Sequence, residues 1–516
     1  MVTQTESPTA ERRAILAVLP GLLLVMLLAM LDNTIVGTAM PTIVTDLGGM
    51  QHFAWVATSY IVASTITTPL YGKLGDLYGR KRLFITAILI FLTGSALSGL
   101  AQDMTQLIVF RALQGLGAGG LMVGVLAIVG DLVAPRDRGK YQGYSAAVMA
   151  LAMVGGPLVG GFFTDHISWR WCFYVNVPLG AIALVMILAK LHTPRNTVSH
   201  RIDYLGIALL SGVATALVLL TTWAGTEYAW GSPQIIGLAV AAGIGLGLFL
   251  WVETRASEPV LPLNLFANRN FSLVAAIGFF QSFGMFGAIV FLPLFLQLVQ
   301  HSSATSSGLL LLPLMVGMMA ASMIAGQLIA KTGKYRWFPF AGAAVMTGGM
   351  LALATIDVDT SKVMTSLYMV VLGVGMGLLM QIVGMIAQNS VGPKDMGVAS
   401  STSMFFRSIG GAFGVSIFGA IFTHTLRTGL SGLPVDVADR LARSGARMSA
   451  ADLAKLPIEA KTMFGQAVAD ATATVFGWGV LFTGLATVLG LFIQHVPLRR
   501  RAPGAPEEPE KELVEA

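Results

Sequence analysis

The chain has 516 residues, of which 55% are hydrophobic and 11% charged, and its mean hydropathy is +0.75. A soluble domain carries about 25% charged residues, so this composition excludes a soluble multidomain enzyme. The net charge is +6, but the basic residues lie in short segments between apolar runs. We find no basic face with interleaved aromatic residues, which argues against nucleic-acid binding.

Apolar runs long enough to cross a bilayer, about 20 residues each, follow one another along the chain. The first run has a signal-peptide-like basic start but lacks a convincing cleavage site, and we interpret it as the first span. The sequence predicts fourteen helical spans near residues 14–36, 52–72, 82–101, 107–130, 141–163, 169–191, 203–223, 233–252, 272–298, 305–330, 337–356, 363–386, 398–423 and 474–495.

The distribution of basic residues supports this register. If both termini are cytoplasmic, the short outside loops carry only Arg170 and Lys362, while the inside segments carry most of the remaining Lys and Arg. This asymmetry is the one expected of cytoplasmic loops. It places residues 1–13 and a Pro/Glu-rich tail, 496–516, on the inside, and it leaves one long outside loop, 424–473. We expect the tail to be disordered.

An internal repeat divides the spans into two halves. The segment from Gly72 to Arg82 is echoed, 254 residues later, by the segment from Gly326 to Arg336. We therefore expect an all-α membrane protein with six-helix bundles over 14–191 and 272–495, separated by two additional helices over 203–252. Repeated helical halves are typical of alternating-access transporters, whose substrate site lies between the halves.

The same shift indicates that the charged residues are not repeated. Asp76 corresponds to Ala330, Asp32 to Phe286 and Arg111 to Thr365. The charged machinery is therefore expected in the first half only.

Asp32 lies deep in the first span, where a carboxylate costs at least about 2.5–3.5 kcal/mol. It should face a cavity or a cation, which suits a proton carrier or a cation binder, although a structural residue near the outer interface is the alternative. Arg111, in the fourth span, lies at a similar depth, so an ion pair with Asp32 is plausible. Its alternative is to reach the outer headgroups. Protonation of Asp32 would release Arg111 and so link a proton to helix packing.

Other residues inside spans are weaker candidates. Arg407 lies about ten residues into the thirteenth span and either lines the cavity or braces the helices. The fifth span combines small residues with a proline, a pattern typical of a closely packed, bendable helix. No span has paired ligands for a metal, and Cys172, the single cysteine, can form neither a disulfide within the chain nor a cysteine metal site. Polar residues expected to line a cavity are Asn33, Gln114, Gln281 and Gln381.

Several motifs resemble those of the major facilitator superfamily. The loop with Gly72, Gly75, Asp76, Gly79 and Arg80 resembles its loop signature, and the segment from Arg111 to Gly120 resembles its second motif. The antiporter motif is matched by Gly143, Gly156, Pro157, Gly160 and Gly161, with Ala152 where glycine is common. Three further segments resemble the fourteen-span drug:proton antiporter branch. They are Leu31–Ile35, then Ala39, Met40 and Pro41, and Trp169–Phe173 with Asn176 and Pro178.

The resemblance implies a major-facilitator fold and a secondary transporter rather than an enzyme, with no cofactor. It implies that Asp76 and Arg80 form a cytoplasmic latch that stabilises the outward-facing state, that Arg111 takes part in proton transfer, and that Asp32 helps to couple protons or to recognise cationic drugs. The expected activity is proton-coupled export of lipophilic, often cationic, drugs or antibiotics across the bacterial inner membrane, by a monomer.

Three other functions remain open at this point. The chain could export one endogenous metabolite or lipid, or it could import a nutrient with protons, although the antiporter motif argues against import. A membrane enzyme or sensor is the third, and no nucleophile–base set supports it. An ATP-driven pump is disfavoured because the phosphate-binding loop of such pumps is absent from the sequence.

Overall fold

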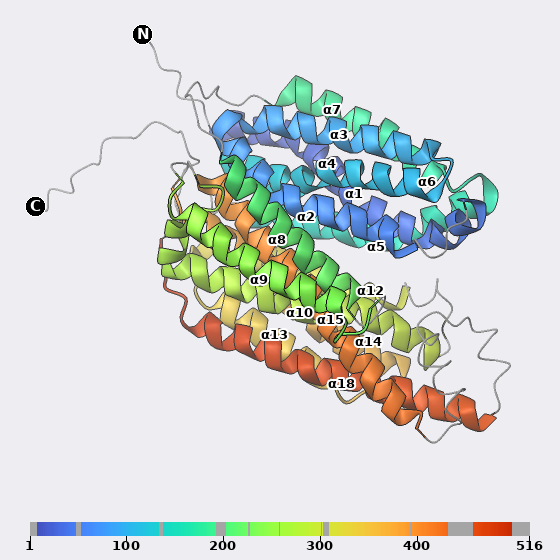
Figure 1. Cartoon of the computed structure of the whole chain (residues 1–516). Coiled ribbons are helices and arrows are strands. Elements are labelled where there is room, and N and C mark those ends of the chain that lie inside the picture. Colours follow the sequence, from blue (N-terminus) through green and yellow to red (C-terminus); the bar gives the residue numbers. More distant parts are fainter. Residues whose placement is uncertain are drawn as a thin grey trace, which may run out of the picture.

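A computed structural model of the chain describes residues 8–47, 53–133, 138–191, 203–224, 228–256, 259–300, 302, 309–392, 395–431 and 458–497. These residues are almost entirely helical, and within them the only extended pairing is an isolated bridge between Ala224 and Tyr228. In Figure 1 the helices run roughly parallel to one another in two layers, with the early helices above and the late helices below.

The upper layer contains the helices of the first half. Here α1 packs against α5 and α7, while α4 packs between α2 and α3. A break at Val175 divides the expected sixth span into a single turn and a longer helix. The helices are α1 (Pro8–Leu47), α2 (Phe53–Tyr78), α3 (Arg80–Leu100), α4 (Met104–Leu132), α5 (Arg138–His166), α6 (Trp171–Tyr174) and α7 (Asn176–Lys190).

The lower layer contains the helices of the second half. Here α10 packs against α15 and α18, and α14 packs between α12 and α13. One continuous apolar core runs through these helices. The elements are η2 (Leu263–Ala267), α10 (Arg269–Leu298), α12 (Leu312–Thr332), α13 (Phe338–Leu353), α14 (Lys362–Asn389), α15 (Met396–Gly429) and α18 (Ile458–Leu491).

The two layers meet where α2 packs on α15 and α5 packs on α12. Two further helices, α8 (Tyr204–Trp223) and α9 (Pro233–Glu253), lie along the side of this contact (Figure 1). Only α8 reaches both layers, through α2 and α15, while α9 packs mainly on α8. Large apolar side chains of α9, including Ile236, Val240 and Ile244, are therefore left exposed, as expected for a helix that faces lipid.

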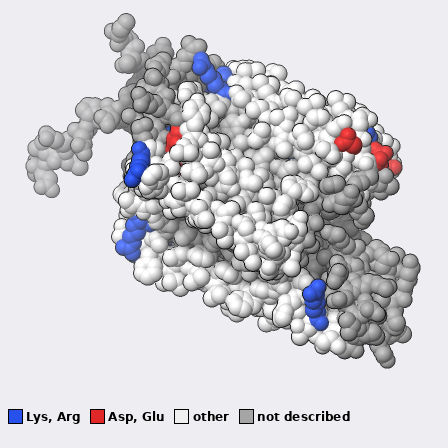
Figure 2. All heavy atoms as spheres, viewed as in Figure 1, with Lys and Arg blue, Asp and Glu red and all other residues white. Residues whose placement is uncertain are grey.

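The exposed surface has the pattern of a membrane protein. On the face drawn in Figure 2, the described charged side chains lie toward the ends of the helices and the wide area between them is uncharged. Twelve of the described helices are long and apolar enough to cross a bilayer. The more polar α2 is not among them, and α13 is a shorter apolar helix of 16 residues. The chain is thus a multi-pass membrane protein, and the count of fourteen spans stays a prediction.

Several helices extend beyond the expected spans. The expected outside loop, 424–473, is shortened from both sides, because α15 continues to Gly429 and α18 already begins at Ile458. The early part of α18 buries Phe464, Ala467 and Val468 against the lower core. Its alanines and apolar side chains therefore favour a packed helix over a loop.

The backbone preserves the internal repeat more closely than the side chains do. Gly79 and Gly333, which are 254 residues apart, are the two described glycines with positive φ, at 96° and 69°. Each therefore sits in a backbone conformation that favours glycine. The two loops of the repeat thus both place a positive-φ glycine at the same position, although their ψ angles, 126° and -1°, and their charges differ.

A second glycine register corrects one of the expected correspondences. Gly115, Gly117 and Gly119 of α4 face the backbone of α2 and α3, where an added Cβ would collide with Tyr60, Phe91 and Ser64. The triplet Gly373, Gly375 and Gly377 of α14 meets Leu314, Met346 and Met318 of α12 and α13 in the same way. The triplets are 258 residues apart, so Arg111 corresponds to Met369 and not to Thr365. The loop-based shift of 254 is wrong here because four residues are inserted before α14.

Candidate functional site

A buried ion pair connects α1 and α4. Nη1 of Arg111 donates to Oδ2 of Asp32 at 2.5 Å, and the side chains are 1% and 0% exposed. The two residues lie in the same half of the helix bundle because α1 and α4 run in opposite directions. The ion pair expected from their similar depth is therefore present in the fold.

Amide groups complete the coordination of the carboxylate. Nε2 of Gln114 and Nδ2 of Asn176 each donate to Oδ1 of Asp32 at 2.8 Å. Oε1 of Gln114 in turn accepts from Nη1 of Arg111 at 2.8 Å. Asn176 also donates to Oγ of Ser95 at 2.9 Å. Asp32 is thus held by groups from α4 and α7, and the network continues into α3 through Ser95.

Aromatic rings close the other side of the guanidinium. The Cζ atom of Arg111 lies 4.1 Å from the ring centroid of Tyr60 and 5.9 Å from that of Phe173. Cation–π contacts of this kind strengthen when water is excluded. The pair is electrically neutral overall, which reduces the cost of burying it. A proton on Asp32 would remove that neutrality and leave Arg111 without its counter-charge.

The fifth-span motif lies directly against the Asp32 segment. Gly156 faces the side chain of Thr34, and a methyl group added at Gly160 would lie 3.1 Å from the backbone oxygen of Ile35. Oγ1 of Thr34 donates to the backbone oxygen of Ala152 at 3.1 Å, which ties α1 to α5. These glycines therefore allow α5 to approach α1 just beyond Asp32. The remaining motif residues lie in α5 as well: Gly143, Pro157, which is exposed, and Gly161, which has open space at its Cβ position.

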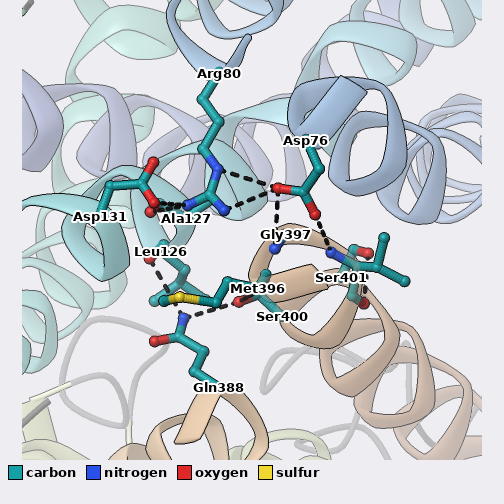
Figure 3. Close-up of polar contacts among 11 residues, drawn as sticks. Asp76, Arg80, Leu126, Ala127, Asp131, Gln388, Met396, Gly397, Ser400 and Ser401 are labelled. Atoms are coloured by element: carbon teal, nitrogen blue, oxygen red, sulfur yellow. Dashed lines mark hydrogen bonds and ion pairs between the residues drawn. The ribbon is translucent and has the colours of Figure 1, made fainter. Parts of the chain in front are cut away.

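A second polar cluster joins the two halves at one end of the bundle, which we call the latch end (Figure 3). Asp76, near the end of α2, accepts from the backbone amides of Gly397 and Val398 at 3.2 and 2.9 Å. These amides belong to the first turn of α15, where Asp395, the residue at the cap position, makes no capping hydrogen bond. Asp76 therefore caps a helix of the other half, and its negative charge suits the positive end of that helix.

Arg80 holds the capping carboxylate in place (Figure 3). Its Nη2 donates to Oδ1 of Asp76 at 2.8 Å, and its Nη1 contacts Oδ1 of Asp131 and the backbone oxygen of Ala127, each at 2.6 Å. The guanidinium thus connects α3, α2 and α4. Gly79, with φ of 96°, forms the turn between α2 and α3 that brings Arg80 back to Asp76.

Close packing supports the latch. An added Cβ at Gly72 would collide with Ser401, and one at Gly397 would collide with the Asp76 carboxylate. At Gly75 an added Cβ would meet only Cγ of Arg80, at 3.7 Å. A further bridge comes from Gln388 of α14, which donates to Oγ of Ser400 at 2.8 Å and to the backbone oxygen of Leu126 at 3.5 Å. The latch end is therefore closed between the halves.

The other cavity candidates are dispersed. Asn33 is exposed next to the buried Asp32. Gln281 of α10 is 1% exposed, and neither of its amide atoms has a hydrogen-bond partner among the described residues. Arg407 lies within α15 and is partly exposed. The side chain of Gln381 lies outside the described residues. Gln114 belongs to the Asp32 network, so it is the one polar candidate in the described part of the chain that is joined directly to the ion pair.

A third cluster lies at the opposite end of the first half. Asp46 accepts from Nε1 of Trp169 at 2.8 Å and from Nη1 of Arg170 at 3.0 Å. The indole hydrogen bond, and then the Arg170 guanidinium, hold the pKa of Asp46 below its ordinary value. Arg170 continues to the backbone oxygen of Ala101 at 3.0 Å. These contacts anchor α6 to the end of α1.

Two kinds of group in these clusters cannot be predicted from the sequence. The first kind is uncharged side chains: Asn176 is identified only as part of a motif, and Ser95 and Tyr60 are not identified, because uncharged residues on separate helices give no signal alone. The backbone amides of Gly397 and Val398 give none either. The one sequence signal near these amides is Asp395, a residue typical of helix starts, directly before α15. In the structure its side chain makes no capping hydrogen bond.

Comparisons with known proteins agree with this architecture. The family model described as Major Facilitator Superfamily matches residues 22–415. The Multidrug transporter protein MdtP of Bacillus subtilis is 38% identical over 515 residues, covering 95% of both chains, and Multidrug resistance protein 3 of the same organism is 40% identical over 432 residues, covering 83% of this chain and 84% of that protein. The solved structure of the proton:xylose symporter XylE superposes with a TM-score of 0.60 at 12% identity, over 92% of this chain and 96% of that one.

The family match spans most of the chain and includes the α1–α4 ion pair, the latch and the α5 glycines. The residues that form these three features are the same residues whose sequence motifs resemble this family. The chain is a member of the major facilitator superfamily, and therefore a membrane transporter of small molecules rather than an enzyme.

Proposed function

We propose that this transporter is a proton-coupled antiporter that exports lipophilic small molecules, cationic drugs among them, across the bacterial inner membrane. The observation that carries the proposal is the sealed Asp32–Arg111 pair, with 0% and 1% exposure. A buried acid that is paired with a buried base can bind a proton only if the pair separates. Proton binding is therefore tied to a rearrangement of α1 against α4.

The latch indicates the side from which Asp32 would take up its proton. Under the positive-inside rule the latch end is cytoplasmic, so this conformation is closed toward the cytoplasm. In this state the substrate route would face outward, where the proton concentration is high in an energised bacterium. A proton taken up by Asp32 would free Arg111, loosen α1, α4 and α7, and favour the return to the inward-facing state.

The choice of export rests on the relatives. The two Bacillus subtilis proteins carry the names multidrug transporter and multidrug resistance protein. The α5 glycines also pack on the segment that follows Asp32, so a bend in α5 would shift α1 at the ion pair. We propose that the transporter acts as a monomer, with the α8–α9 pair facing lipid.

The test is ethidium accumulation in everted membrane vesicles that contain the protein. Vesicles with an acidic interior should accumulate the dye, and an uncoupler should abolish the accumulation. Vesicles from cells without the gene are the control. Uptake that persists in the uncoupler would contradict proton coupling, and absence of any transported lipophilic cation would contradict the multidrug assignment.

A further inference from the structure

Arg407 of α15 is a guanidinium within a membrane-spanning helix that has no ion pair and no hydrogen bond to any described residue. This contrasts with Arg111, which is paired with a carboxylate. An unpaired charge at such a depth costs several kcal/mol unless water or a counter-charge reaches it. A guanidinium stays protonated in proteins, so it cannot escape this cost by losing its proton.

The position of Arg407 can be traced from the latch. Ser400, which hydrogen-bonds Gln388 at the contact between the halves, lies seven residues earlier on α15. Seven residues are two helical turns, about 10 Å, so both side chains lie on the same side of α15. Arg407 therefore lies on the side of α15 that carries Ser400 and faces α14, two turns from the closed latch.

The neighbouring helices shape this position. A methyl group added at Gly278 of α10 would lie 3.1 Å from Cγ of Arg407 and 3.5 Å from Cγ1 of Val383 on α14. The stem of Arg407 therefore crosses the backbone of α10 beside α14. Gly384, one turn from Gln388 on α14, has no atom within 4 Å of its Cβ position. Arg407 itself is partly exposed, so its side chain reaches accessible space beside α10 and α14.

A second polar group in this region also lacks a partner among the described residues. Gln281 lies one turn from Gly278 on α10 and is 1% exposed, and neither amide atom is hydrogen-bonded. In the other half, Asp32 already receives three donors. The second half therefore supplies unused donors, while the buried carboxylate of the first half is fully occupied.

We infer that Arg407 binds the anionic group, a carboxylate or sulfonate, of a lipophilic organic acid or zwitterion in the space between the halves. The inference deepens the proposed function, and rests on it for the assumption that this space holds the transported molecule. Guanidinium and carboxylate fit each other as paired donors and acceptors. The apolar part of the ligand would lie along α10, where Phe279 and Phe280 are partly exposed. The transporter would accept acidic substrates in addition to cations.

The test compares two ligands of the same size that differ in charge, 2-naphthoate and 2-naphthamide. Their binding to the purified full-length protein is measured by equilibrium dialysis at pH 7, without a proton gradient. The wild type should prefer the carboxylate by about tenfold to a hundredfold, the range given by one charge-assisted contact. Arg407→Gln should remove this preference and leave naphthamide binding unchanged, while Arg407→Lys should retain part of it.

Arg427→Gln is the matched control, since Arg427 is exposed about five and a half turns further along the same helix. Equal wild-type affinities for the two ligands, or no binding of either, would overturn the inference. So would an unchanged preference in Arg407→Gln. Loss of both ligands in that variant would indicate a bracing role for Arg407 and would also overturn it. Because no gradient is involved, failure of proton-driven ethidium transport would remove the proposed coupling and leave this result standing.

Discussion

The two halves of the transporter have the same helix packing and different chemistry. In the first half, the glycine triplet of α4 brings α2 and α3 close, and Arg111, one turn earlier, pairs with Asp32. In the second half, the triplet of α14 makes the equivalent contacts, but Met369 stands in place of Arg111. The repeat thus maintains the close approach of backbones, while the buried Asp32–Arg111 ion pair occurs in the first half alone among the described residues.

The largest expected effect comes from removing that ion pair. Asp32→Asn should abolish proton-driven efflux, because an amide, unlike a carboxylate, does not bind and release a proton. It should also leave Arg111 buried without a counter-charge. Breaking a buried pair in this way costs about 3–5 kcal/mol. We expect a lower melting temperature in detergent and no gradient-driven ethidium transport in everted vesicles.

A double variant separates coupling from stability. Asp32→Asn combined with Arg111→Met should regain much of the melting temperature, since neither charge is then left alone, yet it should stay inactive in gradient-driven transport. Additive losses of stability in the double variant would show that the two residues do not act as a pair. Met is the natural choice because it occupies position 369 in the second half.

The next largest effect is expected at the latch loop, and it should have no equivalent at the echo loop of the repeat. Asp76→Asn removes acceptor capacity for two backbone amides of α15 and for Arg80, so the latch end should open more often. The reporter is the labelling rate of Ser401→Cys by a maleimide, in a Cys172→Ser background. Ser401 is buried at the Gly72 contact. We expect labelling to rise about tenfold or more, from the loss of one charge-assisted contact.

Lys334→Gln, in the echo loop, is the control for the latch. Lys334 corresponds to Arg80 in the repeat, but Asp76 has no acidic counterpart there, since Ala330 takes its position. The labelling rate should therefore stay at the wild-type value. Equal acceleration by Asp76→Asn and Lys334→Gln would show that the two loops are equivalent and would contradict a one-sided latch.

The packing itself should be symmetric between the halves. Gly117→Ala and Gly375→Ala each place a methyl group against the backbone of a neighbouring helix, at Phe91 and Met346. Overpacking of this kind costs about 1–3 kcal/mol, so both variants should lower the melting temperature by a similar amount. Gly348→Ala is the control because its Cβ position is open. A loss confined to Gly117→Ala would mean that the second triplet is not a packing site.

The smallest effect is expected at Asp46. Its pKa is held below the ordinary value by Trp169 and Arg170, so its contribution to stability is present above the ordinary value and is lost as the pH falls through the lowered one. The ion pair with Arg170 is exposed, so its contribution is small. Asp46→Asn should lower the melting temperature slightly at neutral pH, and this difference from wild type should vanish in strong acid. A large loss of transport at neutral pH would place Asp46 in the coupling machinery and would contradict its role as an anchor of α6.

The sequence predicted the main features that depend on charge and hydropathy. Asp32 and Arg111 are recognisable because ionisable groups are rare inside spans, and their pairing follows from the opposite directions of α1 and α4. The partners Asn176 and Ser95 are not recognisable, because neutral side chains on distant helices become a network only after the helices pack. Capping of α15 by Asp76 is hidden for a related reason, since the carboxylate meets backbone amides.

The limits of periodicity explain the other differences. Hydropathy places the start of the last span at residue 474, whereas α18 begins at Ile458, because packing against the lower core stabilises less apolar turns. The correspondence of Arg111 with Thr365 assumes one constant shift along the repeat. The glycine contacts of α14 set the true register, at Met369, and such contacts are visible only in three dimensions.

The central proposal is that Asp32 couples protons to transport. Its most direct test compares two modes of ethidium transport by the Asp32→Asn variant in proteoliposomes. We predict that exchange of ethidium down its own gradient continues, while uphill accumulation driven by a pH gradient is lost, with Asp46→Asn retaining both. Uphill accumulation by Asp32→Asn at the wild-type level would contradict this claim.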